Sequence, residues 1–284
     1  MGRLPPVRRR PVNDAFIVSL LSVVPHGLGS RLQGAFARTG LSRLLLDWYV
    51  RTYGVDLTEI EGTIDDYRTL QEFFVRPLKP GARPVAREPE ALASPVDARV
   101  YNAGRLSGYE LPPEAGMHWD VRKLVGGGER YENGHYAILY LSPKDYHRVH
   151  VPREGSVLGY RYLPGRLWPV FPAAVKQVEG LFAKNERLAV RLATQDMGEL
   201  AVVLVGAYGV GRMSASFSPI VTNTGTPGQD VTLPEAWPCD RGDELGRFNL
   251  GSTVILVCEA GRVTWEVERD QDVKMGQRIG RLGS

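Results

Sequence analysis

The chain has 284 residues, of which 43% are hydrophobic and 24% charged, and its formal net charge is +3. A chain of this length can bury a substantial core, and one large domain with an appendage is expected rather than two equal domains. The two cysteines, Cys239 and Cys258, give neither a disulfide framework nor a metal-ligand spacing.

The first residues combine a basic cluster with a short apolar stretch. Four arginines crowd the start, namely Arg3, Arg8, Arg9 and Arg10. Such a cluster contacts anionic lipid or nucleic acid, or is a solvated tail. The apolar stretch at 15–24 is too short to span a bilayer, which takes about 20 residues. No small-residue cleavage site follows it, so a cleaved signal peptide is the less favoured interpretation.

Residues 41–51 predict an amphipathic helix. One face carries large apolar side chains, and the cationic side chains lie off that face. The apolar face is made by Leu41, Leu44, Leu45 and Trp48. Two interpretations stay open at this point: a helix lying at a membrane surface, or a helix packed on the protein's own core.

A further helix is predicted after Thr63. Asp66 stands three residues later, as in a capping box, and Pro77 ends the segment. Its apolar side is made by Tyr67, Leu70, Phe73 and Phe74. We therefore expect an N-terminal helical, membrane-associated region over residues 1–78 and a catalytic domain over residues 79–284.

The second region is rich in strand signals, so the predicted class is α+β with a β-rich catalytic domain. The expected strands are 136–141, 156–163, 188–192, 200–205, 253–258 and 262–267. Residues 218–237 carry no recognisable motif. The segments 94–100 and 272–280 resemble pieces of the hybrid sandwich of lipoyl and biotinyl carrier domains. Neither offers the lysine that a carrier would need, so we expect hybrid-sandwich-like elements without carrier function.

Two of the histidines, His147 and His150, lie close together in the sequence and are the best candidates for a chemical role. Two nearby histidines have three interpretations: they are two ligands of a zinc ion, they are a base and a proton donor, or they are neighbours on the surface without a shared function. A zinc site needs a third ligand, for which only a distant carboxylate such as Asp97 is available. Acid–base partners need only meet in space, so no spacing is required of them.

The step from Gly251 to Ser252 leads directly into an apolar run that predicts a buried strand. Glycine leaves its carbonyl sterically open, so the Ser252 hydroxyl is able to reach the preceding peptide bond. A nucleophilic serine also needs a base and an orienting carboxylate, which His147 or His150 and Asp97 would supply. The alternative is an ordinary turn into a core strand.

Several motifs, taken together and in order, resemble the phosphatidylserine decarboxylase family. They cover most of the chain: 73–84 (FFVRPLKPGARP), 94–97 (SPVD), 141–150 (LSPKDYHRVH), 181–187 (LFAKNER), 205–207 (VGA) and 246–255 (GRFNLGSTVI). Each motif alone is weak, whereas five or more in family order are specific.

The resemblance implies a self-processing proenzyme that cuts itself between Gly251 and Ser252. The products would be a large chain, 1–251, and a small chain, 252–284. Ser252 would become a pyruvoyl group, with no metal and no pyridoxal phosphate.

The resemblance also assigns roles to the other candidate residues. In the family scheme His150 matches the base of self-cleavage and Asp97 its orienting carboxylate. His147 matches a residue of the decarboxylation stage, as proton donor or carboxylate-positioning group. Lys144, Arg148 and Arg187 are candidates for the lipid phosphate or, equally, for structural ion pairs.

The implied reaction converts phosphatidylserine to phosphatidylethanolamine and CO2. The expected partners are the lipid substrate, an anionic membrane surface and the two chains of one precursor; a homodimer stays open, and nucleic acid is not expected. The expected location is peripheral, at the cytoplasmic face of a bacterial membrane. Two alternatives remain: a zinc hydrolase using Asp97, His147 and His150, and a lipid-binding module in which the peptide bond between Gly251 and Ser252 stays intact.

Overall fold

The computed structural model describes residues 34–111, 119–208, 212–249 and 252–283. The arginine cluster at the start of the chain, the apolar stretch 15–24 and Gly251 lie outside the described residues. For Ser252 only the backbone is described.

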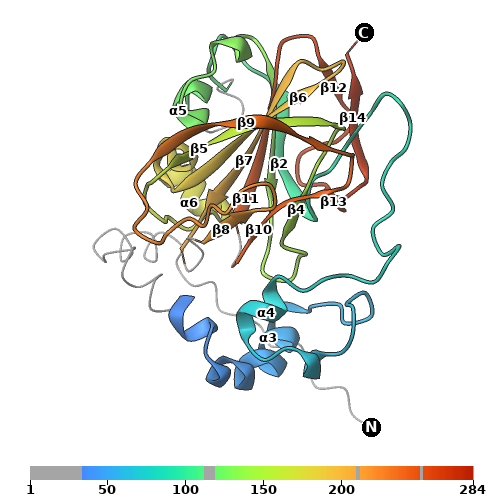
Figure 1. The fold of residues 1–284 in the computed structure, drawn as a ribbon, viewed down its shortest axis with the longest axis vertical. Coiled ribbons are helices and arrows are strands. Elements are labelled where there is room, and N and C mark those ends of the chain that lie inside the picture. Colours follow the sequence, from blue (N-terminus) through green and yellow to red (C-terminus); the bar gives the residue numbers. More distant parts are fainter. Residues whose placement is uncertain (1–33, 112–118, 209–211, 250–251, 284) are drawn as a thin grey trace.

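An eight-stranded antiparallel sheet forms the centre of the molecule, in the order β13-β2-β3-β11-β7-β6-β5-β9 (Figure 1). In that order the strands are β13 (Asp272–Val273), β2 (Ala98–Arg105), β3 (His135–Tyr140), β11 (Ser252–Cys258), β7 (Glu199–Gly206), β6 (Arg187–Thr194), β5 (Gly155–Leu163) and β9 (Gln229–Cys239). β11 therefore lies between β3 and β7, in the interior of the sheet.

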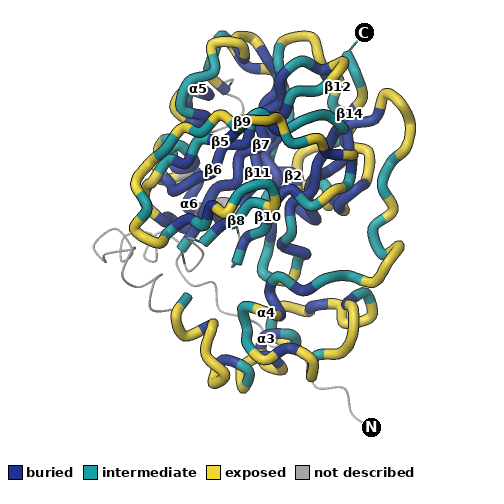
Figure 2. The backbone as a smooth tube through the Cα atoms, viewed as in Figure 1, coloured by how far each residue is buried: buried dark blue, intermediate teal, exposed yellow. Residues whose placement is uncertain are grey.

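The sheet is buried on both faces because successive side chains of a strand point to opposite sides. In β11, Val254 and Leu256 pack into one apolar cluster, and Ile255 and Val257 pack into another. A continuous run of β-branched and aliphatic residues suits such a doubly covered strand, which explains the strand signal in the sequence. Figure 2 shows these strands as the buried interior of the molecule.

Two three-stranded sheets cover the first face and short helices cover the second. The first small sheet has the order β1-β14-β12 and the second β4-β10-β8. Their strands are β1 (Ala91–Ala93), β14 (Arg278–Leu282), β12 (Val263–Trp265), β4 (Arg148–His150), β10 (Glu244–Phe248) and β8 (Met213–Ala215). The helical elements among the described residues after 79 are α5 (Val121–Val125), the 3-10 turn Glu129–Tyr131, α6 (Pro172–Gln177) and α7 (Leu181–Lys184). These findings confirm a β-rich α+β fold.

The two segments that resemble hybrid-sandwich pieces lie side by side. Val273 of β13 pairs with Ala98 of β2. The Ser94 amide donates to the Gln277 carbonyl at 2.7 Å, and the Gly276 amide donates to the Ser94 carbonyl at 2.9 Å. The end of the chain is therefore joined to the segment that contains Asp97.

The N-terminal helical segments form a small body with its own apolar cluster, seen below the sheets in Figure 1. Its elements are the 3-10 helix Gly40–Leu45, α3 (Leu46–Tyr53), the 3-10 helix Ile64–Asp66 and α4 (Leu70–Phe74). The predicted capping box is confirmed at Thr63 and Asp66, but it starts a single 3-10 turn rather than a long helix. Within the described ranges, no helix is both long enough and apolar enough to cross a bilayer.

The predicted apolar face of residues 41–51 is exposed rather than packed on the protein's core. Leu41, Leu44 and Trp48 are 67%, 79% and 55% exposed. The buried side of α3 is formed instead by Leu46 and Tyr49. Of the two interpretations left open by the sequence, packing of this face on the protein's own core is therefore wrong for the described chain.

Candidate active site

A tight turn between β3 and β4 presents the two histidines. The carboxylate of Asp145 accepts hydrogen bonds from the Ser142 amide and hydroxyl, both at 2.7 Å, and the Asp145 amide donates to the Ser142 carbonyl at 2.9 Å. Such side-chain bonds to the local backbone stabilise turns. Burial raises the pKa of the Asp145 carboxyl. We call residues 141–150 the histidine loop.

His147 is fully buried, and one of its ring nitrogens is left free. Nδ1 lies 2.8 Å from the Asp145 carbonyl oxygen, which only accepts, so Nδ1 carries the proton. Nε2 has no hydrogen-bond partner among the described residues. Burial, with a contribution from the charge of Arg76, lowers the pKa of His147 to about 3. The imidazole is therefore neutral, with a free acceptor nitrogen.

Both ring nitrogens of His150 are engaged. Nδ1 donates to the Gly242 carbonyl at 2.7 Å, and Nε2 accepts a hydrogen bond from the Tyr146 hydroxyl at 3.0 Å. Burial lowers the pKa of His150. The ring is thus a neutral base whose unprotonated nitrogen is Nε2. Tyr146 and Gly242, which the sequence reasoning did not select, hold it in place.

Asp97 lies near the histidines but is hydrogen-bonded elsewhere. It is 1% exposed and accepts two bonds from Arg83, at 2.8 and 2.6 Å. It also accepts from the Lys274 ammonium at 3.2 Å and from the Met275 amide at 2.9 Å. These partners lower the pKa of Asp97 against the opposing effect of burial. In this structure the acceptor for the Nδ1 proton of His150 is Gly242, so an orienting role of Asp97 stays a prediction.

The segment around Asp97 nevertheless contacts the histidine loop through the backbone. The His150 amide donates to the Pro95 carbonyl at 2.8 Å. Asp97 and the two histidines are therefore brought to the same end of the sheet.

The expected cleavage point lies at this same end. Ser252 is the first residue of β11 and pairs with Gly206, the last residue of β7. Thr253 pairs with Tyr140, after which the chain enters the histidine loop. The Phe248 amide donates to the His147 carbonyl at 3.0 Å, so Phe248, four residues before Ser252, also lies against the loop.

Two neighbouring cavities open beside the histidine loop. The smaller, of about 150 Å³, is lined among others by Arg76, Asp97 and Tyr146. The larger, of about 430 Å³, is lined among others by Tyr101 and Tyr140. Lys144, Asp145 and Lys274 line both. Groups of both charge signs thus line the space beside the histidine loop.

The other candidate cations have structural partners. Arg148 pairs with Glu244 at 2.9 Å and donates to the Val75 carbonyl. Arg187 is buried and donates to backbone carbonyls, including that of Leu124 at 2.7 Å. Lys144 is exposed at the cavities. In the part of the chain that the structure describes, no three His, Cys, Asp or Glu side chains are placed to hold a metal ion.

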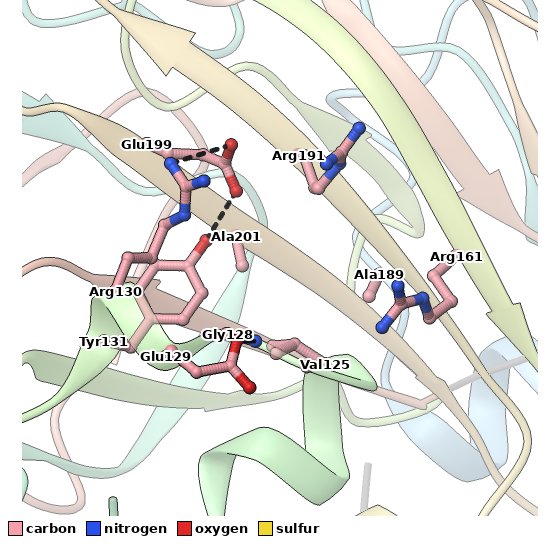
Figure 3. A pocket seen from close by; sticks show the side chains of 11 residues that line it. Val125, Gly128, Glu129, Arg130, Tyr131, Arg161, Ala189, Arg191, Glu199 and Ala201 are labelled. Atoms are coloured by element: carbon pink, nitrogen blue, oxygen red, sulfur yellow. Dashed lines mark hydrogen bonds and ion pairs between the residues drawn. The ribbon is translucent and has the colours of Figure 1, made fainter. Parts of the chain in front are cut away.

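A third cavity, of about 300 Å³, lies at the opposite end of β7 and is shown in Figure 3. Its charged groups pair with their neighbours: Arg130 with Glu199 at 3.2 Å, and Arg161 with Asp230. Tyr131 also donates to Glu199, at 3.3 Å. Because Glu199 opens β7 and Gly206 ends it, this cavity lies a strand length away from the histidine loop.

Comparison with known proteins shows the family of the chain. The chain matches the phosphatidylserine decarboxylase family over residues 70–281. It is 43% identical to a phosphatidylserine decarboxylase proenzyme of Anaeromyxobacter sp. (strain K), over 95% of this chain and 99% of the relative. The proenzyme of Myxococcus xanthus is 39% identical over the same shares of the two chains. That of Brevibacillus brevis is 39% identical over 92% of this chain and 95% of the relative. The chain therefore belongs to the phosphatidylserine decarboxylase family.

Proposed function

We propose that this protein cuts itself between Gly251 and Ser252 and then converts phosphatidylserine to phosphatidylethanolamine and CO2. The observation that carries the proposal is the position of the histidine loop against the first residues of β11. The loop contains the proposed base His150 and the free Nε2 of His147, accepts a hydrogen bond from the Phe248 amide, and follows the strand that pairs with β11. Family membership supports the same reaction.

His150 is the base of self-cleavage in this proposal. The Ser252 hydroxyl attacks the Gly251 carbonyl carbon, and its proton passes to Nε2 of His150, the nitrogen that carries none. The peptide bond becomes an ester. Elimination then releases the carboxylate of Gly251, and hydrolysis of the remaining dehydroalanine releases ammonia and leaves a pyruvoyl group.

Two buried polar atoms, the Thr253 hydroxyl and Nε2 of His147, have no hydrogen-bond partner among the described residues. Unpartnered buried polar atoms are rare, so each favours a polar ligand. Thr253 directly follows position 252, but its side chain points to the opposite side of β11, so of the two only Nε2 of His147 is proposed to contact the substrate. A pyruvoyl group supplies a carbonyl that accepts the electron pair left when a substrate carboxylate departs as CO2.

His147 transfers a proton during decarboxylation in this proposal. Its Nε2 is unprotonated and free, so it accepts a proton from the substrate amine and returns it to the carbon that has lost CO2. Lys144 and Lys274, which line both cavities, are placed for the phosphate of the head group. The carboxylates in the same lining suit the head-group ammonium.

The exposed apolar face of Leu41, Leu44 and Trp48 is the proposed membrane contact. A two-chain lipid stays in the bilayer, so an enzyme at the interface reaches its head group most directly. We propose peripheral attachment to an anionic bilayer at the cytoplasmic face of a bacterial membrane.

The test is an assay of CO2 release and phosphatidylethanolamine formation from phosphatidylserine in mixed micelles. Wild type is expected to be active, His147→Ala to be cleaved but inactive, and His150→Ala to stay uncut. His135→Ala, on β3 at the end remote from the loop, is the matched control and is expected to match wild type. A cleaved wild-type chain that releases no CO2 would refute the proposed reaction.

A further inference from the structure

Arg76 lies between the helical body and the histidine loop. Its side chain is almost completely buried, and its guanidinium lies over the Phe73 ring at 5.1 Å. Nη2 donates to the carbonyls of Lys144 and Asp145, at 2.8 and 3.2 Å. Arg76 therefore holds two consecutive carbonyls of the turn that precedes His147.

The charge of Arg76 is not neutralised by an ion pair within the described chain. Its Nε and Nη1 are buried without a hydrogen-bond partner among the described residues. Its other electrostatic neighbours are the hydroxyls of Tyr49 and Tyr67 and the more distant carboxylates of Asp97 and Asp145. Burying an unpaired cation is costly. Its presence beside a catalytic loop calls for a reason other than stability.

His147 shares a hydrogen-bond acceptor with Arg76. The Asp145 carbonyl accepts from Nη2 of Arg76 and from Nδ1 of His147. The charged groups that act on His147 are Arg76, from the segment after α4, and Asp97, from the segment before β2. The ring of Phe74, from α4, covers the imidazole with 3.9 Å between ring centroids. Of these neighbours, Arg76 opposes protonation of the imidazole.

We propose that Arg76 is a positioning residue for His147. It fixes the Asp145 carbonyl that holds the Nδ1 proton, and its unpaired charge adds to burial in opposing protonation of Nε2. The use of Nε2 in turnover rests on the proposed function, whereas the protonation state of the ring does not.

The test measures the protonation of His147 without turnover. Hydrogen–deuterium exchange at the imidazole C2 position, read by tandem mass spectrometry across a pH series, reports each histidine separately. The full-length Ser252→Ala chain is used, with Arg76→Gln, Arg76→Lys and Arg187→Gln added singly. Arg187 is the matched control because it is also buried and holds backbone carbonyls, but those carbonyls belong to α5.

The pKa of His147, about 3 with Arg76 present, is expected to rise by about 1 unit or more in Arg76→Gln. It should stay within about half a unit in Arg76→Lys, which keeps the charge. Arg187→Gln should leave it unchanged, and His150 is an internal reference in every sample. An unshifted His147 in Arg76→Gln, or an equal shift in Arg187→Gln, would overturn the proposal.

Arg76→Lys decides the question if Arg76→Gln does not fold. A rise of about 1 unit in that variant would show that the charge of Arg76 is not what opposes protonation of the ring beyond the effect of burial. Failure of the proposed function would look different: wild type would release no CO2, while the shifts in the Ser252→Ala chains would still be seen.

Discussion

Backbone carbonyls set the tautomers of both histidines in the loop. Nδ1 of His147 donates to Asp145, and Nδ1 of His150 donates to Gly242. In each ring the basic nitrogen is therefore Nε2. The difference lies in what Nε2 meets: the Tyr146 hydroxyl for His150, and no described residue for His147. One ring is thus held at both nitrogens, while the other keeps a buried acceptor nitrogen without a partner among the described residues.

Replacing Tyr146 separates orientation from proton transfer. Tyr146→Phe removes one hydrogen bond to His150, worth about 1 kcal/mol, so self-cleavage should slow by about tenfold or less. His150→Ala removes the base itself and should slow cleavage by about 100-fold or more. The rates are measured by following the uncut chain on gels after cell-free synthesis. Equal slowing in the two variants would mean that Tyr146 itself transfers the proton.

Burial of neutral His147 makes stability depend on pH. Its pKa is about 3 in the folded chain and about 6.5 in the unfolded chain, so between these values only the unfolded chain binds the proton. The free energy of unfolding should therefore fall as pH falls, by about 1–2 kcal/mol between pH 6.5 and 5. Urea unfolding of the Ser252→Ala chain measures it, and His147→Gln should show a shallower dependence. The same slope in both chains would exclude His147 as the cause.

The sequence selected the candidate reacting residues but not the groups that hydrogen-bond to them. Residue type and motif order were enough to select four candidates: Asp97, His147, His150 and Ser252. Gly242 is remote from the histidines in sequence and acts through a backbone carbonyl, for which no residue type is diagnostic. Likewise, nothing in the sequence showed that Asp97 would be hydrogen-bonded to Arg83 and the end of the chain.

At the scale of elements, α3 and the 3-10 helix before it divide their side chains between two environments. Leu46 is completely buried, whereas Leu44, two residues earlier, is 79% exposed. Such an exposed apolar group marks an interaction surface rather than a core. The helical body also contacts the histidine loop, because the Tyr49 hydroxyl donates to the Pro143 carbonyl. The proposed membrane surface and the loop are therefore joined by a single short helix.

Polar substitution of the exposed face tests its role. Leu41→Ser, Leu44→Ser and Trp48→Ser together should weaken binding to anionic vesicles severalfold or more, with little change in thermal stability. Leu46→Ala is the matched control from the same segment; it should cost about 2–5 kcal/mol of stability. Vesicle co-sedimentation and thermal unfolding provide the two measurements. Undiminished vesicle binding by the triple variant would exclude this face as the contact.

The strands that the sequence predicted are those with continuous apolar runs, such as β11 and β7. The long strand β9 was missed because it lies at the sheet edge and contains Pro234 and Pro238, which are tolerated on edge strands but weaken a strand signal. The helix expected after Thr63 is divided into two short pieces. Its apolar side chains pack as predicted, with Phe73 and Phe74 buried. The spacing of the apolar residues therefore predicted which side chains are buried, but not the length of the helix.

For the whole molecule, residues 252–283 contribute strands to the main sheet and to one of the two small sheets. β11 lies inside the main sheet, β13 pairs at its edge, and β12 and β14 belong to a small sheet. Lys274 and Met275 also bind Asp97 of the preceding chain. After cleavage before Ser252, β11 of the smaller chain would therefore remain hydrogen-bonded to β3 and β7 of the larger chain.

The two chains should remain associated after cleavage without any covalent link. Removing β11 would expose the apolar cores on both faces of the sheet, which is strongly unfavourable. Native mass spectrometry should detect the two chains together, and strong denaturant should separate them. Dissociation of the small chain under native conditions would contradict the packing described above.

Intact-mass analysis of wild type beside Ser252→Ala tests the central claim most directly. Wild type should give a large chain ending at Gly251 and a small chain, residues 252–284, whose first residue has the mass of a pyruvoyl group instead of serine. Ser252→Ala should give one uncut chain. A single uncut chain in both samples, from folded protein, would contradict self-processing at this site and with it the proposed pyruvoyl chemistry.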